Sequence, residues 1–184
     1  FATEVIVKGV REGLEAQRPA ALTPEQQAAL ETLEPIFDER TFAPFLLHGV
    51  TGSGKTEVYL RLVARALAQN RGALILVPEI ALTPQLVGRF RSRFGNRVAL
   101  LHSAMKDRER LLHWQQLRKG EVTIAVGVRS AIFAPIKNVG LVIVDEEHDP
   151  SFKQDEKLRY NARDLAVVRA QHAGAMVVLG SATP

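Results

Sequence analysis

Short apolar runs alternate with longer amphipathic stretches along most of the chain. The apolar runs are rich in β-branched residues and predict strands at Phe45–Leu47, Ala73–Val77, Val98–Leu101, Val122–Val126, Leu141–Val144 and Met176–Leu179. Between them, apolar residues at helical spacing predict helices at Thr56–Gln69, Pro84–Phe94, Asp107–Lys119 and Ala162–His172. Continuous apolar strands separated by helices are typical of a mostly parallel sheet with helices on both faces. The pattern predicts an α/β fold with binding sites at the carboxyl ends of the strands.

The first 21 residues do not follow this pattern. They hold one short alternating segment, Glu4–Lys8, and then a polar stretch, so we interpret residues 1–21 as a linker or the tail of an upstream domain. Residues 22–184 are the size of one domain and open with Thr23 and Pro24, a good N-cap and a good first helical residue. Because the chain begins with Phe1 and ends at Pro184 directly after an apolar strand, we expect it to be a piece of a larger protein.

Composition narrows the possible functions only slightly. The chain has no cysteine, which argues against disulfides and against a cysteine-based zinc site in this piece. No apolar run is long enough for a membrane span, so we expect no membrane partner. The net charge of +4 is weakly suggestive of a polyanionic partner.

A phosphate-binding loop runs from Gly49 to Thr56, with the spacing glycine, four residues, Gly-Lys-Thr. Glycines let the backbone curl so that successive N–H groups point at a polyphosphate. In such loops the lysine meets the β- and γ-phosphates, and the hydroxyl that follows it binds Mg²⁺. We therefore expect the nucleotide-binding residues to be Gly49, Thr51, Gly52, Ser53, Gly54, Lys55 and Thr56, with Thr56 also a metal ligand.

A cluster of acidic residues follows the strand Leu141–Val144. Asp145, Glu146 and Glu147 come first, then His148, and such a group after a buried strand is costly unless a cation meets it. Beside a phosphate loop, Asp145 is expected to hold Mg²⁺, and Glu146 to orient and deprotonate the attacking water. The alternative is an acidic surface loop. With the phosphate loop upstream we interpret the chain as an ATPase, with Lys55, Asp145 and Glu146 as catalytic residues.

Gln26 has two interpretations. It stands three residues after Thr23, so its side chain can close a capping box on the Thr23 N–H. Its amide can equally read the adenine edge of a nucleotide. Spacing alone does not decide between the two.

Together, these motifs resemble those of superfamily-two helicases, and most closely the bacterial primosomal helicases that restart stalled replication forks. The resemblance covers Leu22 to Pro184 and rests on blocks that follow one another in the family's order: Leu22–Gln26, Gly49–Thr56, Val77–Thr83, Leu101–Ser103, Val128–Phe133, Asp145–His148 and Gly180–Pro184. It implies a RecA-like P-loop NTPase lobe, the first lobe of a motor that uses ATP and Mg²⁺ to move on and unwind DNA. The second lobe is expected in cis outside this chain, and the isolated lobe is expected to hydrolyse ATP very slowly.

The resemblance also implies roles for polar residues at the strand ends. Gln26 becomes the adenine reader. Four residues match blocks that hold one DNA strand by its backbone: Pro78, Thr83, His102 and Arg129. Three match elements that couple the γ-phosphate to the DNA site: His148, Ser181 and Thr183.

The segment from Phe152 to Arg163 resembles the aromatic-rich loop of the family, which senses single strands by stacking and by cationic contacts. Its candidate DNA-contacting residues are Phe152, Lys153, Arg159 and Tyr160, and the alternative is a charged loop with two buried aromatic residues. Leu158 stands where the family usually carries Trp, which is expected to weaken the coupling to DNA.

The implied partners are forked and single-stranded DNA, primosome proteins and single-strand-binding proteins, in the bacterial cytoplasm at the nucleoid. Two other functions stay open: a nucleotide-dependent switch or scaffold that moves no strand, and an RNA helicase of the same superfamily. We interpret Arg89, Arg91 and Arg93 as a solvated face, and Trp114, which lies among leucines, as a core residue.

Overall fold

The computed structural model describes residues 21–50, 52–156 and 158–182. The predicted nucleotide-binding residue Thr51 and the predicted coupling residue Thr183 lie outside these ranges. The same is true of all but the last residue of the expected linker, 1–21.

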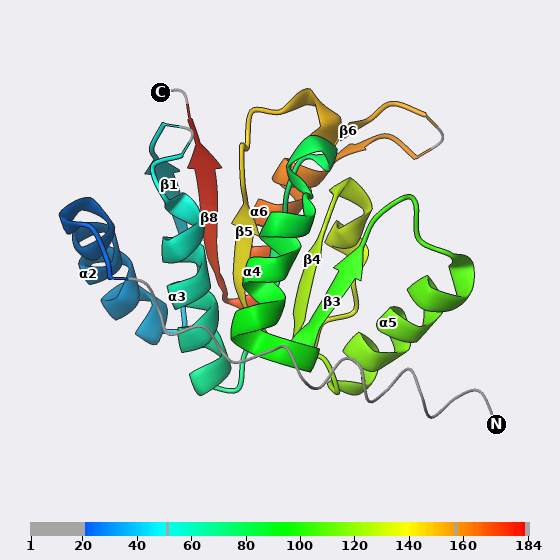
Figure 1. Cartoon of the computed structure of the whole chain (residues 1–184), viewed down its shortest axis with the longest axis horizontal. Helices are drawn as coiled ribbons and strands as arrows, with labels where there is room; N and C mark the ends of the chain where they lie inside the picture. Colours follow the sequence, from blue (N-terminus) through cyan, green and yellow to red (C-terminus); the bar gives the residue numbers. More distant parts are fainter. Residues whose placement is uncertain (1–20, 51, 157, 183–184) are drawn as a thin grey trace.

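A six-stranded sheet runs through the centre of the molecule (Figure 1). In spatial order its strands are β1 (Ala43–His48), β8 (Met176–Ser181), β5 (Val139–Val144), β2 (Gly72–Leu76), β4 (Ile124–Gly127) and β3 (Val98–Leu101). Every neighbouring pair is parallel. The predicted α/β class is confirmed, with strand ends that differ from the sequence prediction by a few residues.

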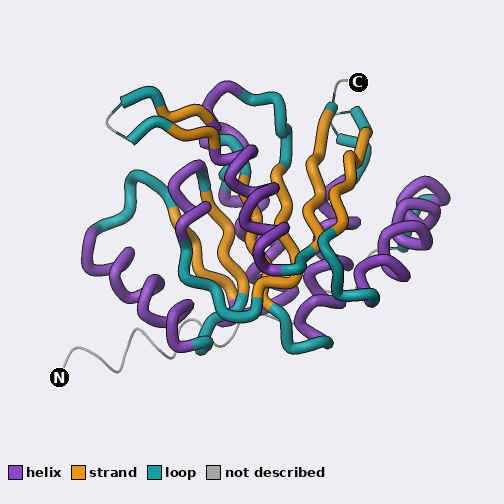
Figure 2. The backbone as a smooth tube through the Cα atoms, turned by 180° about the vertical axis from the view of Figure 1, so that it is seen from behind, coloured by secondary structure: helices purple, strands orange, loops and turns teal. Residues whose placement is uncertain are grey.

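Helices cover both faces of the sheet, as Figures 1 and 2 show from opposite sides. One core cluster joins the sheet to α2 (Pro24–Asp38), α3 (Lys55–Ala68) and α4 (Pro84–Phe94). The other joins it to α5 (Asp107–Lys119) and α6 (Ala162–Ala173). Successive β2 residues alternate between the clusters, as the two-residue period of a strand requires.

Shorter elements lie in the connections between these strands and helices. They are the 3₁₀ turns η1 (Glu79–Ala81), η2 (Gly95–Arg97), η3 (Arg129–Phe133) and η4 (Pro150–Phe152), and the antiparallel hairpin of β6 (Lys153–Gln154) and β7 (Tyr160–Asn161). The hairpin could not be predicted from the sequence, because strands of two residues are too short to show an alternation of apolar and polar positions. Among the described helices, none is long and apolar enough to cross a bilayer.

Candidate functional site: a phosphate loop facing an acidic strand end

The loop from Gly49 to Gly54 joins β1 to α3 at the carboxyl edge of the sheet. Its entry is fixed by a hydrogen bond from Gly49 N to Ser181 O, 3.0 Å away at the end of β8. At its exit Gly54 takes a left-handed conformation with φ 86° and caps α3, so the helix begins at Lys55. The first N–H groups of α3 therefore face the loop, which is the arrangement that binds phosphate.

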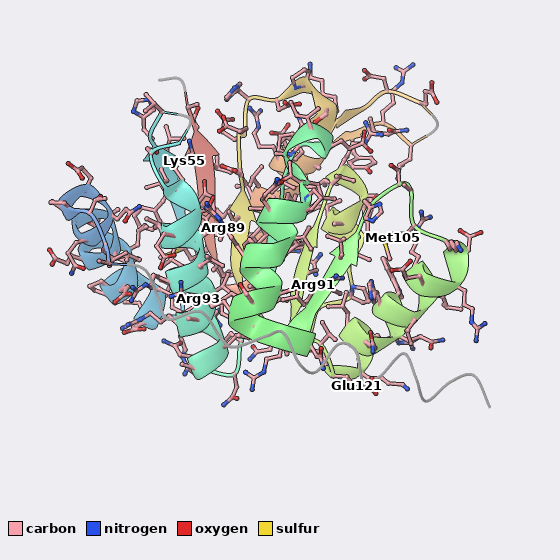
Figure 3. All side chains as sticks on the ribbon, viewed as in Figure 1. Lys55, Arg89, Arg91, Arg93, Met105 and Glu121 are labelled. Atoms are coloured by element: carbon pink, nitrogen blue, oxygen red, sulfur yellow. The ribbon has the colours of Figure 1, made fainter. Side chains whose placement is uncertain are left out.

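Lys55 connects the loop to the acidic cluster. Its Nζ donates a hydrogen bond to the Gly49 carbonyl and lies 3.5 Å from Glu146 Oε1. The Lys55 side chain is only 9% exposed, whereas that of Glu146 is 24% exposed. Figure 3 shows Lys55 at the loop end of α3. The structure thus brings together two of the three predicted catalytic residues from positions far apart in sequence.

Asp145 lies directly after β5 and accepts a hydrogen bond from the Tyr59 hydroxyl, with 2.8 Å between the two oxygens. Burial raises the pKa of the Asp145 carboxyl, and the charge of Glu146 raises it further. The Tyr59 hydroxyl and the Lys55 charge oppose that rise. Burial also raises the pKa of Tyr59, so its hydroxyl stays protonated and acts as a donor. Tyr59 was not among the predicted site residues, because its only signal in the sequence was its place one helical turn after Lys55.

Glu146 has a left-handed backbone conformation, with φ 47°. Residues other than glycine rarely adopt it, and such strain clusters at functional sites. On its other side Glu146 Oε2 lies 3.9 Å from His148 Nε2, and His148 Nδ1 lies 3.4 Å from Ser181 Oγ. His148 therefore lies between the candidate base and the end of β8, and its coupling role stays a prediction.

Gln26 forms the capping box that its spacing allowed. Its Oε1 accepts a hydrogen bond from Thr23 N at 2.9 Å, and its backbone N donates to Thr23 Oγ1 at 3.3 Å. The Gln26 Nε2 also donates to the Gly54 carbonyl at 3.2 Å. The capping role is confirmed, and the same side chain touches the phosphate loop. Its reading of adenine stays a prediction.

The residues present fit a magnesium ion. Thr56 and Asp145 offer a hydroxyl and a carboxylate, the oxygen ligands that Mg²⁺ prefers, and Mg²⁺ usually binds with few protein ligands, waters and substrate phosphates. Within residues 21–50, 52–156 and 158–182, no group of three or more His, Cys, Asp or Glu side chains could hold a metal ion. A cation at this site would therefore depend on bound phosphates as well as on Thr56 and Asp145.

A second feature of the same edge is a cleft of about 860 Å³ beyond β2, β4 and β3. Several side chains that line it come from the predicted DNA-contacting blocks or from α5: His102, Ser103, Arg110, Trp114, Arg129 and Tyr160. Arg129 donates hydrogen bonds to the carbonyls of Ser151 and Lys153, so it also anchors the β6–β7 hairpin. Tyr160 packs edge-on against Phe133, with 5.2 Å between ring centres.

The predicted DNA-contacting residues differ in their exposure to solvent. Phe152 is 1% exposed and lies in the core, so the prediction that it stacks on bases is wrong. Pro78 is buried, and Thr83 accepts a hydrogen bond from Leu86 N and caps α4. Lys153 and Arg159 are exposed, as a contact with DNA would require. The burial of Phe152 could not be predicted from the sequence, because a short charged loop has no periodic pattern of apolar and polar residues.

Of two further expectations outside the motifs, the core position of Trp114 was wrong and the solvated arginine face was confirmed only in part. Trp114 is half-buried and lines the cleft, whereas Leu117, three residues later on α5, is buried in the core. Arg93 pairs with Glu57 of α3 at 2.8 Å, whereas Arg89 and Arg91 are exposed (Figure 3). Arg110 was also overlooked as a cleft residue, since it stands in a run of alternating charges.

Comparisons with known proteins support the motifs on which this site is built. The family model for DEAD/DEAH box helicases matches residues 23–184. The chain is 51% identical to the replication restart protein PriA of Bacillus subtilis over 166 residues, which is 90% of this chain and 21% of the relative. It is 48% identical to the PriA protein of Haemophilus influenzae, covering 89% of this chain and 22% of the relative. It therefore spans about a fifth of the length of these relatives.

Two solved structures are also similar to this chain. RecG bound to a three-way DNA junction is similar over 91% of this chain and 22% of RecG, with a TM-score of 0.70 and 27% identity. The C-terminal domain of the DEAD-box protein Dbp5 shares the fold, with a TM-score of 0.55, 16% identity and 77% of each chain covered. The motif-based resemblance to replication-restart helicases is confirmed by these matches.

Proposed function

The chain belongs to the DEAD/DEAH box helicase family, and from this we propose that it is the ATP-binding lobe of a DNA motor that acts in replication restart. The observation that carries the proposal is the approach of Lys55 Nζ to Glu146 Oε1, 3.5 Å apart, beside the half-buried Asp145. It joins a phosphate-binding cation, a candidate base and a candidate metal ligand at one edge of the sheet. The similarity to PriA and RecG supports DNA as the nucleic acid.

In this proposal the residues of the chain have separate tasks. The loop N–H groups and Lys55 bind the phosphates, and Gln26 sits where it could read adenine beside Gly54. Thr56 and Asp145 would hold Mg²⁺, which supplies positive charge to the phosphate oxygens when bound. Glu146 orients the attacking water and accepts its proton at a carboxylate oxygen.

Single-stranded DNA is proposed to lie along the cleft. Arg129 and Arg110 provide positive charge there, and His102 and Ser103 provide short polar groups suited to phosphates. Glu79 and Glu156 also line the cleft, so its charge is mixed rather than uniformly basic. Tyr160 offers an aromatic face to a base, which is a contact that tolerates any sequence. His148 and Ser181 would relay the state of the nucleotide to this strand.

The remaining roles depend on protein outside this chain. We propose that a second lobe completes the ATP site, that forked and single-stranded DNA are the substrates, and that primosome and single-strand-binding proteins are partners. The proposed location is the bacterial cytoplasm, at the nucleoid. Related NTPases gain about 10³–10⁵ in rate from an arginine supplied to the site, so the lobe by itself is expected to turn over very slowly.

The test is steady-state ATP hydrolysis by a longer form of the protein that carries a second motor lobe. It is measured without nucleic acid, with forked or single-stranded DNA, and with RNA of the same sequence. A Lys55→Ala protein provides the blank. Stimulation by DNA that is absent from the blank supports the proposal. Equal stimulation by RNA would favour an RNA helicase, and indifference to both would favour a switch or scaffold.

A further inference from the structure

Tyr59 places a hydroxyl in the core beside the acidic cluster. It lies on α3 four residues after Lys55, and four residues along a helix return to the same face. The residue is 2% exposed, and its hydroxyl lies 2.8 Å from Asp145 Oδ1. An apolar side chain would satisfy packing at such a position, whereas a buried phenol must find a hydrogen-bond acceptor. The acceptor it finds is the carboxylate expected to meet the cation.

Gly180 leaves the space that this hydrogen bond occupies. A Cβ added to Gly180 would lie 1.9 Å from the Tyr59 hydroxyl oxygen and 2.9 Å from Asp145 Oδ1. No side chain can therefore stand at position 180 of β8 without displacing the hydrogen-bonded pair. Three elements meet at this one contact: α3 after the phosphate loop, the end of β5, and the start of the Gly180–Pro184 block.

We propose that Tyr59 is a positioning residue that holds the Asp145 carboxylate in the rotation needed to meet a divalent cation at the nucleotide site. The inference rests on the proposed function, since it assigns a partner to a residue of that site. A carboxylate with one oxygen held by a fixed donor keeps its remaining lone pairs in fixed directions. Outer hydrogen-bond partners of metal ligands act in this way, and their loss typically costs about 10–100-fold in metal affinity or activity.

The Tyr59→Phe substitution removes the hydroxyl and keeps the ring. Binding of a fluorescent ADP analogue is titrated over a series of Mg²⁺ concentrations, and Mn²⁺ binding is followed by electron paramagnetic resonance. We expect the half-saturating cation concentration to rise about 10-fold, with nucleotide affinity in chelator unchanged. In a longer, two-lobe form, high Mg²⁺ is expected to restore hydrolysis, because the defect lies in cation affinity.

Two further variants separate positioning from stability. Val63→Ala removes a fully buried side chain one turn further along α3 and is expected to lower thermal stability without moving the cation midpoint. Gly180→Ala crowds the Tyr59 hydroxyl and is expected to reproduce the Tyr59→Phe shift. In the double variant Tyr59→Phe/Gly180→Ala, the cation midpoint is expected to move by less than the sum of the two single shifts. Both substitutions act through the same contact.

The outcomes distinguish this inference from the proposed function. A Tyr59→Phe protein with the cation midpoint of the wild type would overturn the inference, provided that the wild type binds nucleotide in a Mg²⁺-dependent way. The inference would also be overturned if Val63→Ala moved the cation midpoint as far as Tyr59→Phe does. The shift would then follow from lost stability. If the wild type binds no nucleotide, or binds it equally well in chelator, the proposed nucleotide site itself fails.

Discussion

Lys55 Nζ lies 3.5 Å from Glu146 Oε1, so the cation of the phosphate loop and the candidate base form an ion pair across the site. The same ammonium donates to the Gly49 carbonyl. A phosphate entering the loop would compete with both partners for Lys55. Glu146 would then be left with His148, whose Nε2 lies 3.9 Å from Glu146 Oε2. The position of the base is thereby linked to phosphate binding.

Replacing Glu146 is expected to separate catalysis from stability. Glu146→Gln keeps the shape but cannot accept a proton, so hydrolysis by a two-lobe form should fall about 10²–10⁴-fold while nucleotide still binds. Glu146→Gly loses the same function and relieves the left-handed conformation. It should therefore be more stable than Glu146→Gln by about 0.5–1 kcal/mol, measured by chemical denaturation. Equal stability of the two variants would contradict stored strain at this residue.

Gln26 can be tested with two substitutions that differ in one group. Glu at position 26 can still accept the Thr23 N–H and close the capping box, but it offers no amide donor. Gln26→Glu should keep the capping box, lose the hydrogen bond to the Gly54 carbonyl, and lose the preference for ATP over GTP in binding assays. Gln26→Ala should lose that preference and also about 1 kcal/mol of stability. A Gln26→Glu protein that still prefers ATP would reduce Gln26 to its capping role.

Asp38 is expected to give a pH dependence to the packing of α2 on α3. Its hydrogen bonds to the Arg65 guanidinium lower the pKa of the Asp38 carboxyl from its usual value of 3.8. The unfolded chain therefore takes up the proton more readily, so the pair stabilises the fold above that value. This contribution is lost as the pH falls through the lowered pKa of the folded state. Asp38→Asn should lower the melting temperature at pH 7, and this difference from the wild type should shrink as the pH falls through the lowered pKa of Asp38.

Trp114 provides a built-in probe of the cleft, since it is the only tryptophan in the sequence. Single-stranded oligothymidine is expected to quench its fluorescence, because the half-buried indole lines the cleft. Arg129→Gln should weaken this binding and reduce the slope of log K against log salt by about 1. Arg118→Gln, which removes an exposed arginine of α5, serves as control. DNA that binds with no change in emission would place the strand elsewhere.

The sequence by itself determined the α/β class, the phosphate loop and the acidic strand end. These are local signals: apolar runs of strand length, the glycine spacing of Gly49–Thr56, and the charges that follow Val144. The parallel order of strands then brings the carboxyl ends to one edge, whichever neighbours they have. The meeting of Lys55 with Glu146 could be predicted for that reason.

Only the tertiary structure decided which side chains serve the site and which serve the core. Tyr59 and Phe152 are both buried aromatic residues, yet one donates a hydrogen bond to Asp145 and the other packs in the core. Trp114 lines a cleft although Leu112 and Leu117 stand within three residues of it in the sequence. These outcomes depend on contacts between elements distant in sequence. Burial and hydrogen-bond partners are properties of the packed fold, and no local pattern of residues carries them.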